Sequence, residues 1–254
     1  MPFSVEKHEI GSRYTTSKMR LLETGANKGV EIVIPPEPRQ DPDLGNVLYE
    51  HSILHLSDQI PRTIRMLSPK GSPEVHIKRH TNYPEVRSEY TNHYMKDAFH
   101  IRTQETSIAG KEENNNALLL DEEKVSARRV IAIDILNPRI SDENKLLTPN
   151  LEKIIPDARQ KSLATDWLST ESETMINYQF SEINFKWFGL QERVESILEK
   201  TFVRINSIYY RRMYYWIDEW YNMTISDIEK YEETIKEELD KKRNSAEFTG
   251  LRVK

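Results

Sequence analysis

The stretch 184–220 constrains the fold of this chain more than any other. It opens with an aromatic turn, Phe185 to Gly189, and continues with apolar side chains that recur at helical spacing. The apolar positions are Leu190, Val194, Ile197, Leu198, Ile205, Ile208, Tyr209, Met213, Trp216, Ile217 and Trp220. A stripe of this length must cover another apolar surface. We therefore expect one long helix lying on the concave face of a curved sheet.

The segments upstream of this helix supply the strands of that sheet. Alternating apolar residues predict strands over 29–34, 47–56, 74–81, 85–94, 98–106, 129–136 and 175–186, of which 129–136 is the strongest. Pro35 and Pro36 should close the first strand, so that 37–46 forms a loop. The run 110–116 reads as a hairpin tip or exposed loop, and 137–172 as a long excursion.

Helices are expected before and after the sheet. The sequence patterns at 10–23 and 62–67 predict two short helices. The pattern at 225–243 predicts the last helix, which begins at the capping pair Thr224 and Asp227. The resulting order indicates an α+β fold, a mostly antiparallel sheet with helices packed on one face. A length of 254 residues fits one domain spanning 1–254.

Composition excludes several classes of protein. The net charge of -5 argues against nucleic acid as the main partner, and no apolar run is long enough to span a bilayer. The chain has no cysteine, so thiol nucleophiles and cysteine-based zinc sites are excluded. Charges stand near the N-terminus where a signal peptide needs an apolar core. These features favour a cytoplasmic protein.

Several motifs in collinear order resemble those of one family. They are HSILHLSDQIPRTIRMLSPKG, NYPEVRSEYTNHYMKDAF, VIAIDI, NFKWFGLQERVE, YRRMYYWIDEW and DIEKYEETIKEELDKKR. Together they are similar to the phosphatidylinositol transfer proteins, lipid carriers of helix-grip, StART-like architecture. The resemblance implies a monomer without cofactor or catalytic residues. It would enclose one phospholipid, phosphatidylinositol or phosphatidylcholine, between sheet and long helix, with residues 225–254 as the lid.

The resemblance also implies where the protein meets membranes. Trp187 and Phe188 stand where the family has two adjacent tryptophans on an exposed loop. Aromatic side chains suit the bilayer interface. We expect this pair to dock the protein transiently on a membrane, while the protein is otherwise cytoplasmic.

The lipid-headgroup residues match the family only in part. Glu232 falls at the family's glutamate on the last helix. Other positions depart from it: Glu50 and Ser52 replace a threonine and a lysine, and Thr81, followed by Asn82, stands at the position of an asparagine. Gln179 replaces a lysine near the buried phosphate. These six residues are the candidate headgroup set.

The lost lysine leaves two hypotheses for the headgroup. Because an uncompensated buried phosphate is costly, the site could be rebuilt from Lys78, Arg79 or Arg87. Alternatively the cargo is a choline lipid, whose ammonium would be held by Glu50, Glu232 and neighbouring tyrosines.

Two other functions compete with the carrier. Bound lipid could regulate a partner such as a lipid kinase, or the chain could be a helix-grip enzyme with Glu50, Asp134 or a histidine as general base. The spaced histidine pairs, 51 with 55 and 76 with 80, lack the specificity of a zinc motif, and we expect no metal. The aromatic loop and the lid favour the carrier.

Overall fold

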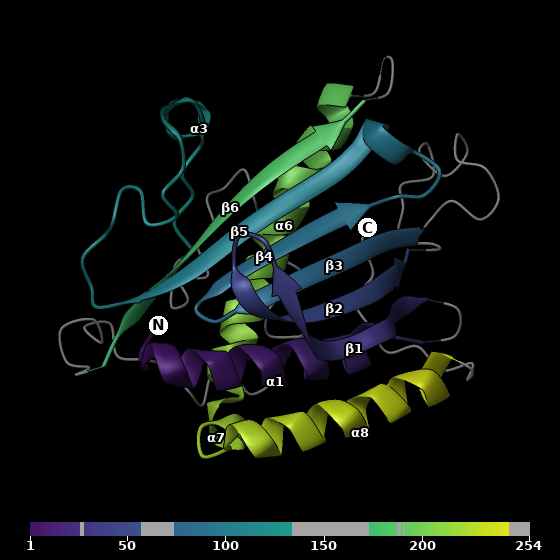
Figure 1. The fold of residues 1–254 in the computed structure, drawn as a ribbon, viewed down its shortest axis with the longest axis vertical. Helices are drawn as coiled ribbons and strands as arrows, with labels where there is room; N and C mark the ends of the chain where they lie inside the picture. The colour runs from purple at the N-terminus through teal and green to yellow at the C-terminus, as the bar shows by residue number, and fades with distance from the viewer. Residues whose placement is uncertain (26–27, 57–73, 134–172, 187–188, 190, 244–254) are drawn as a thin grey trace.

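The computed structural model describes residues 1–25, 28–56, 74–133, 173–186, 189 and 191–243 (Figure 1). Its strands are β1 (Gly29–Asp41), β2 (Gly45–His55), β3 (Glu74–Asn82), β4 (Glu85–Thr91), β5 (Phe99–Ala109) and β6 (Met175–Phe185). Its helices are α1 (Val5–Glu23), η2 (Lys96–Ala98), α3 (Glu122–Ala127), α6 (Gln191–Tyr215), α7 (Ile217–Trp220) and α8 (Ile225–Arg243).

The described strands form one sheet in the order β1-β2-β3-β4-β5-β6, and every neighbouring pair is antiparallel. Alternation sets the two faces: Phe99, Ile101 and Thr103 of β5 are buried, while Arg102 is exposed. The sheet curves, with α6 behind it and α1 and α8 across one end (Figure 1). The predicted α+β class is confirmed.

The first strand is longer than predicted. β1 continues through Pro35 and Pro36 to Asp41, so a loop over 37–41 was the wrong prediction. β1 lies at the edge of the described sheet and its register shifts on both sides of Ile34. Edges and bulges are where a strand tolerates proline, because the missing N–H is not needed for the ladder.

The predicted strand 129–136 is also wrong over its described part. Residues 129–133 lie outside the sheet, and the Val130 side chain is 76% exposed. The edge of β5 is taken by β6 along its whole length, from Phe99↔Phe185 to Ala109↔Met175. Alternation predicts a strand only where a partner edge is free. The rest of this segment, Asp134 included, and the segments 62–67 and 137–172 lie outside the described residues.

The central helix covers the sheet as expected at its first turns. Val194 packs with Phe99, Ile101 and Phe185, and the ring of Phe202 meets Tyr90 edge-on at 5.8 Å. The helix is not continuous, since α6 ends at Tyr215 and α7 begins at Ile217. Ile205, predicted in the apolar stripe, is 50% exposed.

A second core joins the helices at the end of the sheet. Trp220 is fully buried and packs with Phe3, Met213 and Ile228. Gly11 of α1 makes room for it, because a Cβ there would lie 2.8 Å from the indole ring. α1 begins at Val5, five residues before the predicted start, and Ser4 caps it. α8 has the predicted bounds and the Thr224–Asp227 capping contact.

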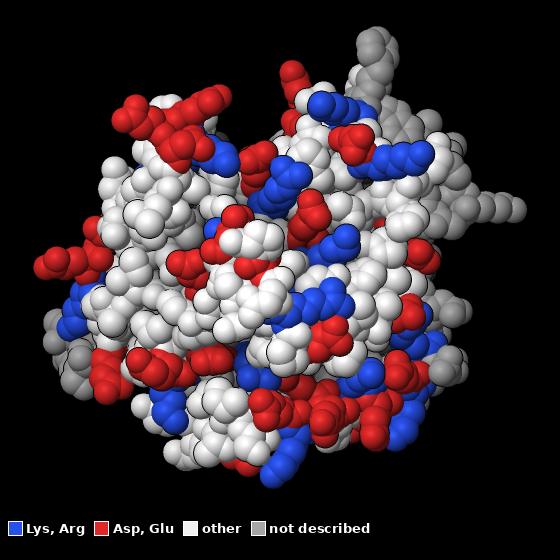
Figure 2. Space-filling view, in the orientation of Figure 1, with Lys and Arg blue, Asp and Glu red and all other residues white. Residues whose placement is uncertain are grey.

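No helix in the described part of the chain is long and apolar enough to cross a bilayer. Acidic and basic side chains mix over the face seen in Figure 2, and acids gather along α8. The exposed acids of α8 include Glu229, Glu233, Glu237 and Asp240.

Candidate functional site

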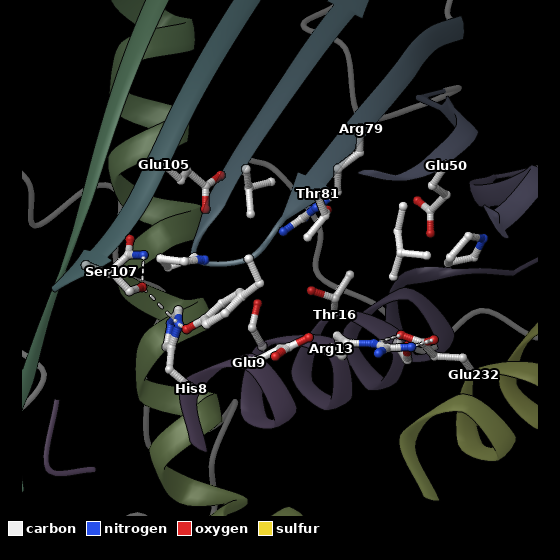
Figure 3. A pocket seen from close by; sticks show the side chains of 18 of the residues that line it. His8, Glu9, Arg13, Thr16, Glu50, Arg79, Thr81, Glu105, Ser107 and Glu232 are labelled. Atoms are coloured by element: carbon white, nitrogen blue, oxygen red, sulfur yellow. Dashed lines mark hydrogen bonds and ion pairs between the residues drawn. The ribbon is translucent and has the colours of Figure 1, made fainter. Parts of the chain in front are cut away.

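A polar pocket lies between α1, the inner face of the sheet and α8 (Figure 3). Its cavity volume is about 80 Å³. Many of its lining residues are charged or titratable: His8, Glu9, Arg13, Arg20, Glu50, Arg79, Glu105 and Glu232. They come from segments at the two ends of the chain and from the strands between, so only the folded protein brings them together.

The strand register places the sheet residues of this pocket on one face. Glu50 of β2 lies opposite Arg79 of β3, which lies opposite Ser88 of β4. Because successive side chains alternate between faces, Thr81 shares this inner face with Arg79, whereas Lys78 is exposed on the other. The α1 residues that line the pocket are spaced by three or four, as one helix face requires.

Two arginines of α1 each hold one carboxylate. Arg20 contacts both oxygens of Glu50, with Nη1 donating to Oε2 at 2.8 Å. Arg13 donates from Nε and Nη2 to the two oxygens of Glu232 at 3.0 and 2.6 Å. Burial would raise the pKa of Glu50, but the charge and hydrogen bonds of Arg20, together with the charge of Arg79, outweigh it and hold that pKa below its usual value. Each of the two carboxylates therefore has a guanidinium as its contact partner.

The third arginine, Arg79, has no such partner. Its guanidinium forms no ion pair or hydrogen bond with any residue that the structure describes, and it reaches from β3 toward α1 (Figure 3). The carboxyl of Glu105 lies in the same pocket and accepts a hydrogen bond from Gln179 Nε2 at 3.2 Å. Burial raises the pKa of Glu105, while the charge of Arg79 opposes that rise. The charges of Glu105 and Glu50 in turn raise the pKa of Arg79, against the effect of its own burial.

A neutral histidine closes the other end of the pocket. Nδ1 of His8 lies 2.9 Å from the Tyr83 hydroxyl and 3.2 Å from Ser107 Oγ. Burial, together with the charges of the N-terminus and Arg79, lowers the pKa of His8 to about 3. The ring therefore adds no charge to the pocket at neutral pH.

The comparisons with known proteins decide the family. The family model described as phosphatidylinositol transfer protein matches residues 1–237. The chain belongs to the phosphatidylinositol transfer protein family. It is 29% identical over 262 residues to the human phosphatidylinositol transfer protein beta isoform, covering 98% of this chain and 94% of that protein.

Two further relatives show that the similarity extends over most of the chain. Phosphatidylinositol transfer protein 2 of Dictyostelium discoideum is 30% identical over 243 residues, or 95% of this chain and 93% of that protein. Cytoplasmic phosphatidylinositol transfer protein 1 of Xenopus tropicalis is 28% identical over 244 residues, or 95% of this chain and 73% of that protein.

Three of the residues predicted from the family resemblance meet in the pocket, namely Glu50, Thr81 and Glu232. Gln179 lies beside it, between Glu105 and Asn206. Ser52 is fully buried on the inner face, outside the pocket lining, and its hydroxyl has no hydrogen-bond partner among the described residues. Their roles in binding lipid stay predictions.

The other predicted residues lie elsewhere. Asn82 is exposed at the β3–β4 turn and donates to the carbonyl of Leu44 at 2.9 Å. It is therefore away from the pocket lining. Trp187 and Phe188, the predicted docking pair, lie outside the described residues.

Of the basic residues proposed to rebuild the site, only Arg79 lines the pocket. Arg87 pairs with Asp43 at 2.9 Å, and Lys78 is exposed. Arg13 and Arg20 were not predicted as site residues, although their spacing of seven places them on one face of α1. That face could not be linked to the sheet before the fold was known.

The histidine pairs do not form a metal site in the part of the chain that the structure describes, where no group of three or more potential ligands is arranged around one point. His51 Nε2 instead lies 3.1 Å from His76 Nδ1, and His55 Nε2 lies 2.8 Å from Glu31.

Proposed function

We propose that the protein encloses one phospholipid, chiefly phosphatidylinositol, and exchanges it between membranes without catalysing a reaction. The observation that carries this proposal is the match to the family model over 1–237. A polar pocket lined by Glu50, Thr81 and Glu232, three of the six residues that the resemblance predicts for the headgroup, supports it. The protein would act in the cytoplasm and touch membranes transiently.

The physical need for an enclosed site follows from the acyl chains. Moving about 30 methylenes into water at about 0.8 kcal/mol each costs about 24 kcal/mol, so a carrier must offer them an equally apolar surface. The candidate surface lies beyond the pocket, between the sheet and α6, where Val75 and Ile183 of the sheet and Leu198 and Phe202 of α6 are only partly buried. The headgroup would lie in the polar pocket and the chains along this surface.

α8 is placed to act as the lid. Its Glu232 lines the pocket and pairs with Arg13, the ring of Tyr231 stacks on Tyr14 at 4.8 Å, and Arg243 near its end pairs with Glu31 at 2.6 Å. Movement of α8 away from α1 would uncover the pocket. We infer that the loop carrying Trp187 and Phe188 docks on the bilayer and that this movement then admits or releases the lipid.

The choline-lipid hypothesis is less well supported by this geometry. It needs Glu50 and Glu232 to hold a quaternary ammonium, and both carboxylates are already paired with arginines. An inositol headgroup carries no cation and needs no free carboxylate.

A vesicle transfer assay tests the proposal. Donor vesicles carrying labelled phosphatidylinositol are mixed with unlabelled acceptors, and the protein should speed the appearance of label in the acceptors in proportion to its concentration. A folded protein that leaves transfer at the rate without protein would refute the carrier function.

A further inference from the structure

Three histidines form a row on the outer face of the sheet, the face turned away from the pocket. The histidine row consists of His51 of β2, His76 of β3 and His93, which follows β4. His51 Nε2 lies 3.1 Å from His76 Nδ1, and the ring centroids of His76 and His93 are 4.8 Å apart. The binding of a lipid in the pocket uses none of these three side chains.

Two members of the histidine row gain their positive charge only at acidic pH. Burial and the charge of Lys78 lower the pKa of His51. Burial, followed by the charges of its two histidine neighbours, lowers the pKa of His76, and Glu74 opposes this effect. Because an imidazole ordinarily titrates near pH 6.5, His51 and His76 are neutral at pH 7 and become charged as the pH falls.

The other charges at this end of the outer face balance one another. Glu89 lies 3.5 Å from Arg102, and Glu31 lies 2.6 Å from Arg243 of α8. Among the described residues, the charged or titratable side chains around the row are Glu31, His55, Glu74, Lys78, Glu89, Lys96, Asp97, His100, Arg102, Glu182, Lys186 and Arg243. Acids and bases are equal in number in this set, so protonation of the row decides the sign of the surface.

The histidine row lies at the end of the sheet where the predicted docking loop begins. A line of antiparallel pairs crosses the outer face from His76 through Thr91 and His100 to Asn184. β6 ends one residue later, and the segment that carries the predicted docking pair follows it in the sequence. The ends of β2, β4 and β6 and the starts of β3 and β5 lie together at this end (Figure 1).

An exposed tyrosine stands beside the row. Tyr94 is 55% exposed and belongs to the connection 92–98 between β4 and β5. The buried Asn92 accepts a hydrogen bond from its backbone N–H at 3.0 Å, and the N–H of Lys186 donates to the carbonyl of Ala98 at 2.7 Å. The connection is thus attached to the end of β6. A tyrosine ring, apolar with a polar tip, suits the interface of a bilayer.

We propose that the histidine row and Tyr94 form a second membrane contact, which binds anionic bilayers more tightly as the pH falls from 7 to 5. The inference rests on the membrane contact in the proposed carrier function. An anionic surface stabilises charged imidazoles, so binding and protonation favour each other. A bilayer fits better than a soluble polyanion, because the exposed ring of Tyr94 needs an apolar layer to enter.

Vesicle flotation measures this contact. Wild type, the triple variant His51→Gln with His76→Gln and His93→Gln, and the control His80→Gln are mixed at pH 7, 6 and 5 with phosphatidylcholine vesicles that contain or lack phosphatidylserine. His80 is a suitable control because it lies on the outer face at the other end of β3, where it meets Asp41 at 2.7 Å. His8 is unchanged in every variant, so its effect on stability is shared, and circular dichroism at pH 5 verifies folding.

Wild type and His80→Gln should bind phosphatidylserine vesicles about tenfold more tightly at pH 5 than at pH 7, since each added cation strengthens such binding by about fivefold. The triple variant should keep the affinity of wild type at pH 7 and lose most of the gain at pH 5. Vesicles without phosphatidylserine should show no gain. Tyr94→Ser should bind less tightly at every pH and keep the gain.

A triple variant with the full gain of wild type, or a wild type without any gain, would overturn the inference. An equal gain on vesicles that lack phosphatidylserine would also overturn it, because the contact would not be electrostatic. Should the triple variant not fold, His93→Gln decides, since this exposed side chain should carry part of the gain and an unchanged gain would contradict its role.

Two further outcomes separate the parts of the proposal. Binding by Tyr94→Ser equal to that of wild type at every pH would overturn the bilayer as the partner that the ring enters. The vesicle transfer assay at pH 7 is run beside the flotation. Normal transfer without an acid gain refutes this inference alone, whereas a folded wild type that transfers no lipid refutes the proposed function.

Discussion

At the scale of the residue, the pocket is a set of buried charges whose partners can be removed one at a time. Arg20 and Glu50 form the most enclosed pair, with side-chain exposures of 15% and 9%. Replacing Arg20 by Met should lower the free energy of unfolding by about 3 kcal/mol, because Glu50 would lose both contacts with the Arg20 guanidinium and keep only the more distant charge of Arg79. Urea denaturation followed by circular dichroism measures the change.

The double variant Arg20→Met with Glu50→Leu is the matched comparison. It removes both charges and fills their space with apolar atoms, so it should regain most of the stability lost in Arg20→Met. If the double variant is as unstable as the single one, the loss comes from packing and the charge argument fails.

His8 predicts a pH dependence of stability. Its folded pKa is about 3 against an ordinary value of 6.5. Below about pH 6.5 the imidazole of His8 therefore binds a proton in the unfolded chain but not in the folded chain. The free energy of unfolding falls as the pH drops through this range. The contribution of this group is about 1.4 kcal/mol per pH unit between its two pKa values.

Urea denaturation at pH 7, 6 and 5 measures the sign and the size of this pH dependence of the free energy of unfolding. In His8→Gln the slope of the free energy of unfolding against pH should be smaller by about 1.4 kcal/mol per pH unit. His93→Gln changes an exposed histidine and should leave this slope unchanged. Equal slopes in wild type and His8→Gln would show that His8 is not held neutral.

At the scale of the element, α8 is attached to the rest of the molecule by a few separable contacts. Ile228, Ile235 and Leu239 anchor its apolar face, and the Arg13–Glu232 pair joins it to α1 at the pocket. Glu232→Gln should leave the apolar contacts and weaken the pair. Amide hydrogens of α8 should then exchange roughly tenfold faster, while those of β3 and β4 keep their rates.

Hydrogen exchange with mass spectrometry resolves this difference by element. The control is Glu233→Gln, an exposed neighbour on the same helix. Unchanged exchange in Glu232→Gln would mean that the apolar face alone holds the lid closed.

The elements themselves were predictable where local pattern and tertiary position agree. Alternation located β2 to β6, and helical spacing located α6 and α8, each to within a few residues. The prolines of β1 led to a wrong prediction of where that strand ends. A strand tolerates proline when it lies at a sheet edge, and the local sequence does not reveal that position. The strand predicted at residues 129–133 is not formed, because a segment with strand-like alternation also needs a free sheet edge to pair with.

The pocket was predictable only in part for the same reason. Glu50, Thr81 and Glu232 followed from the family resemblance, since their neighbours in sequence carry it. Arg13 and Arg20 carry no motif. Their role arises from α1 lying across the inner face of the sheet, which is a property of the folded chain.

At the scale of the whole molecule, a lipid carrier requires a docking surface as well as a pocket. Trp187→Ala combined with Phe188→Ala should abolish transfer between vesicles while the thermal unfolding midpoint and the bound lipid stay as in wild type. The expected loss is at least about tenfold, since two aromatic anchors at the bilayer interface are removed. Vesicle flotation should show the same loss of membrane association. Normal transfer by the double variant would refute the docking role.

The carrier function itself rests on one lipid being held by one chain. Native mass spectrometry of the purified protein, with lipid extraction from the same sample, tests this most directly. The carrier function predicts a folded protein with one phospholipid per chain, and phosphatidylinositol as the main species extracted. A folded protein that carries no lipid, even after incubation with phosphatidylinositol vesicles, would contradict it.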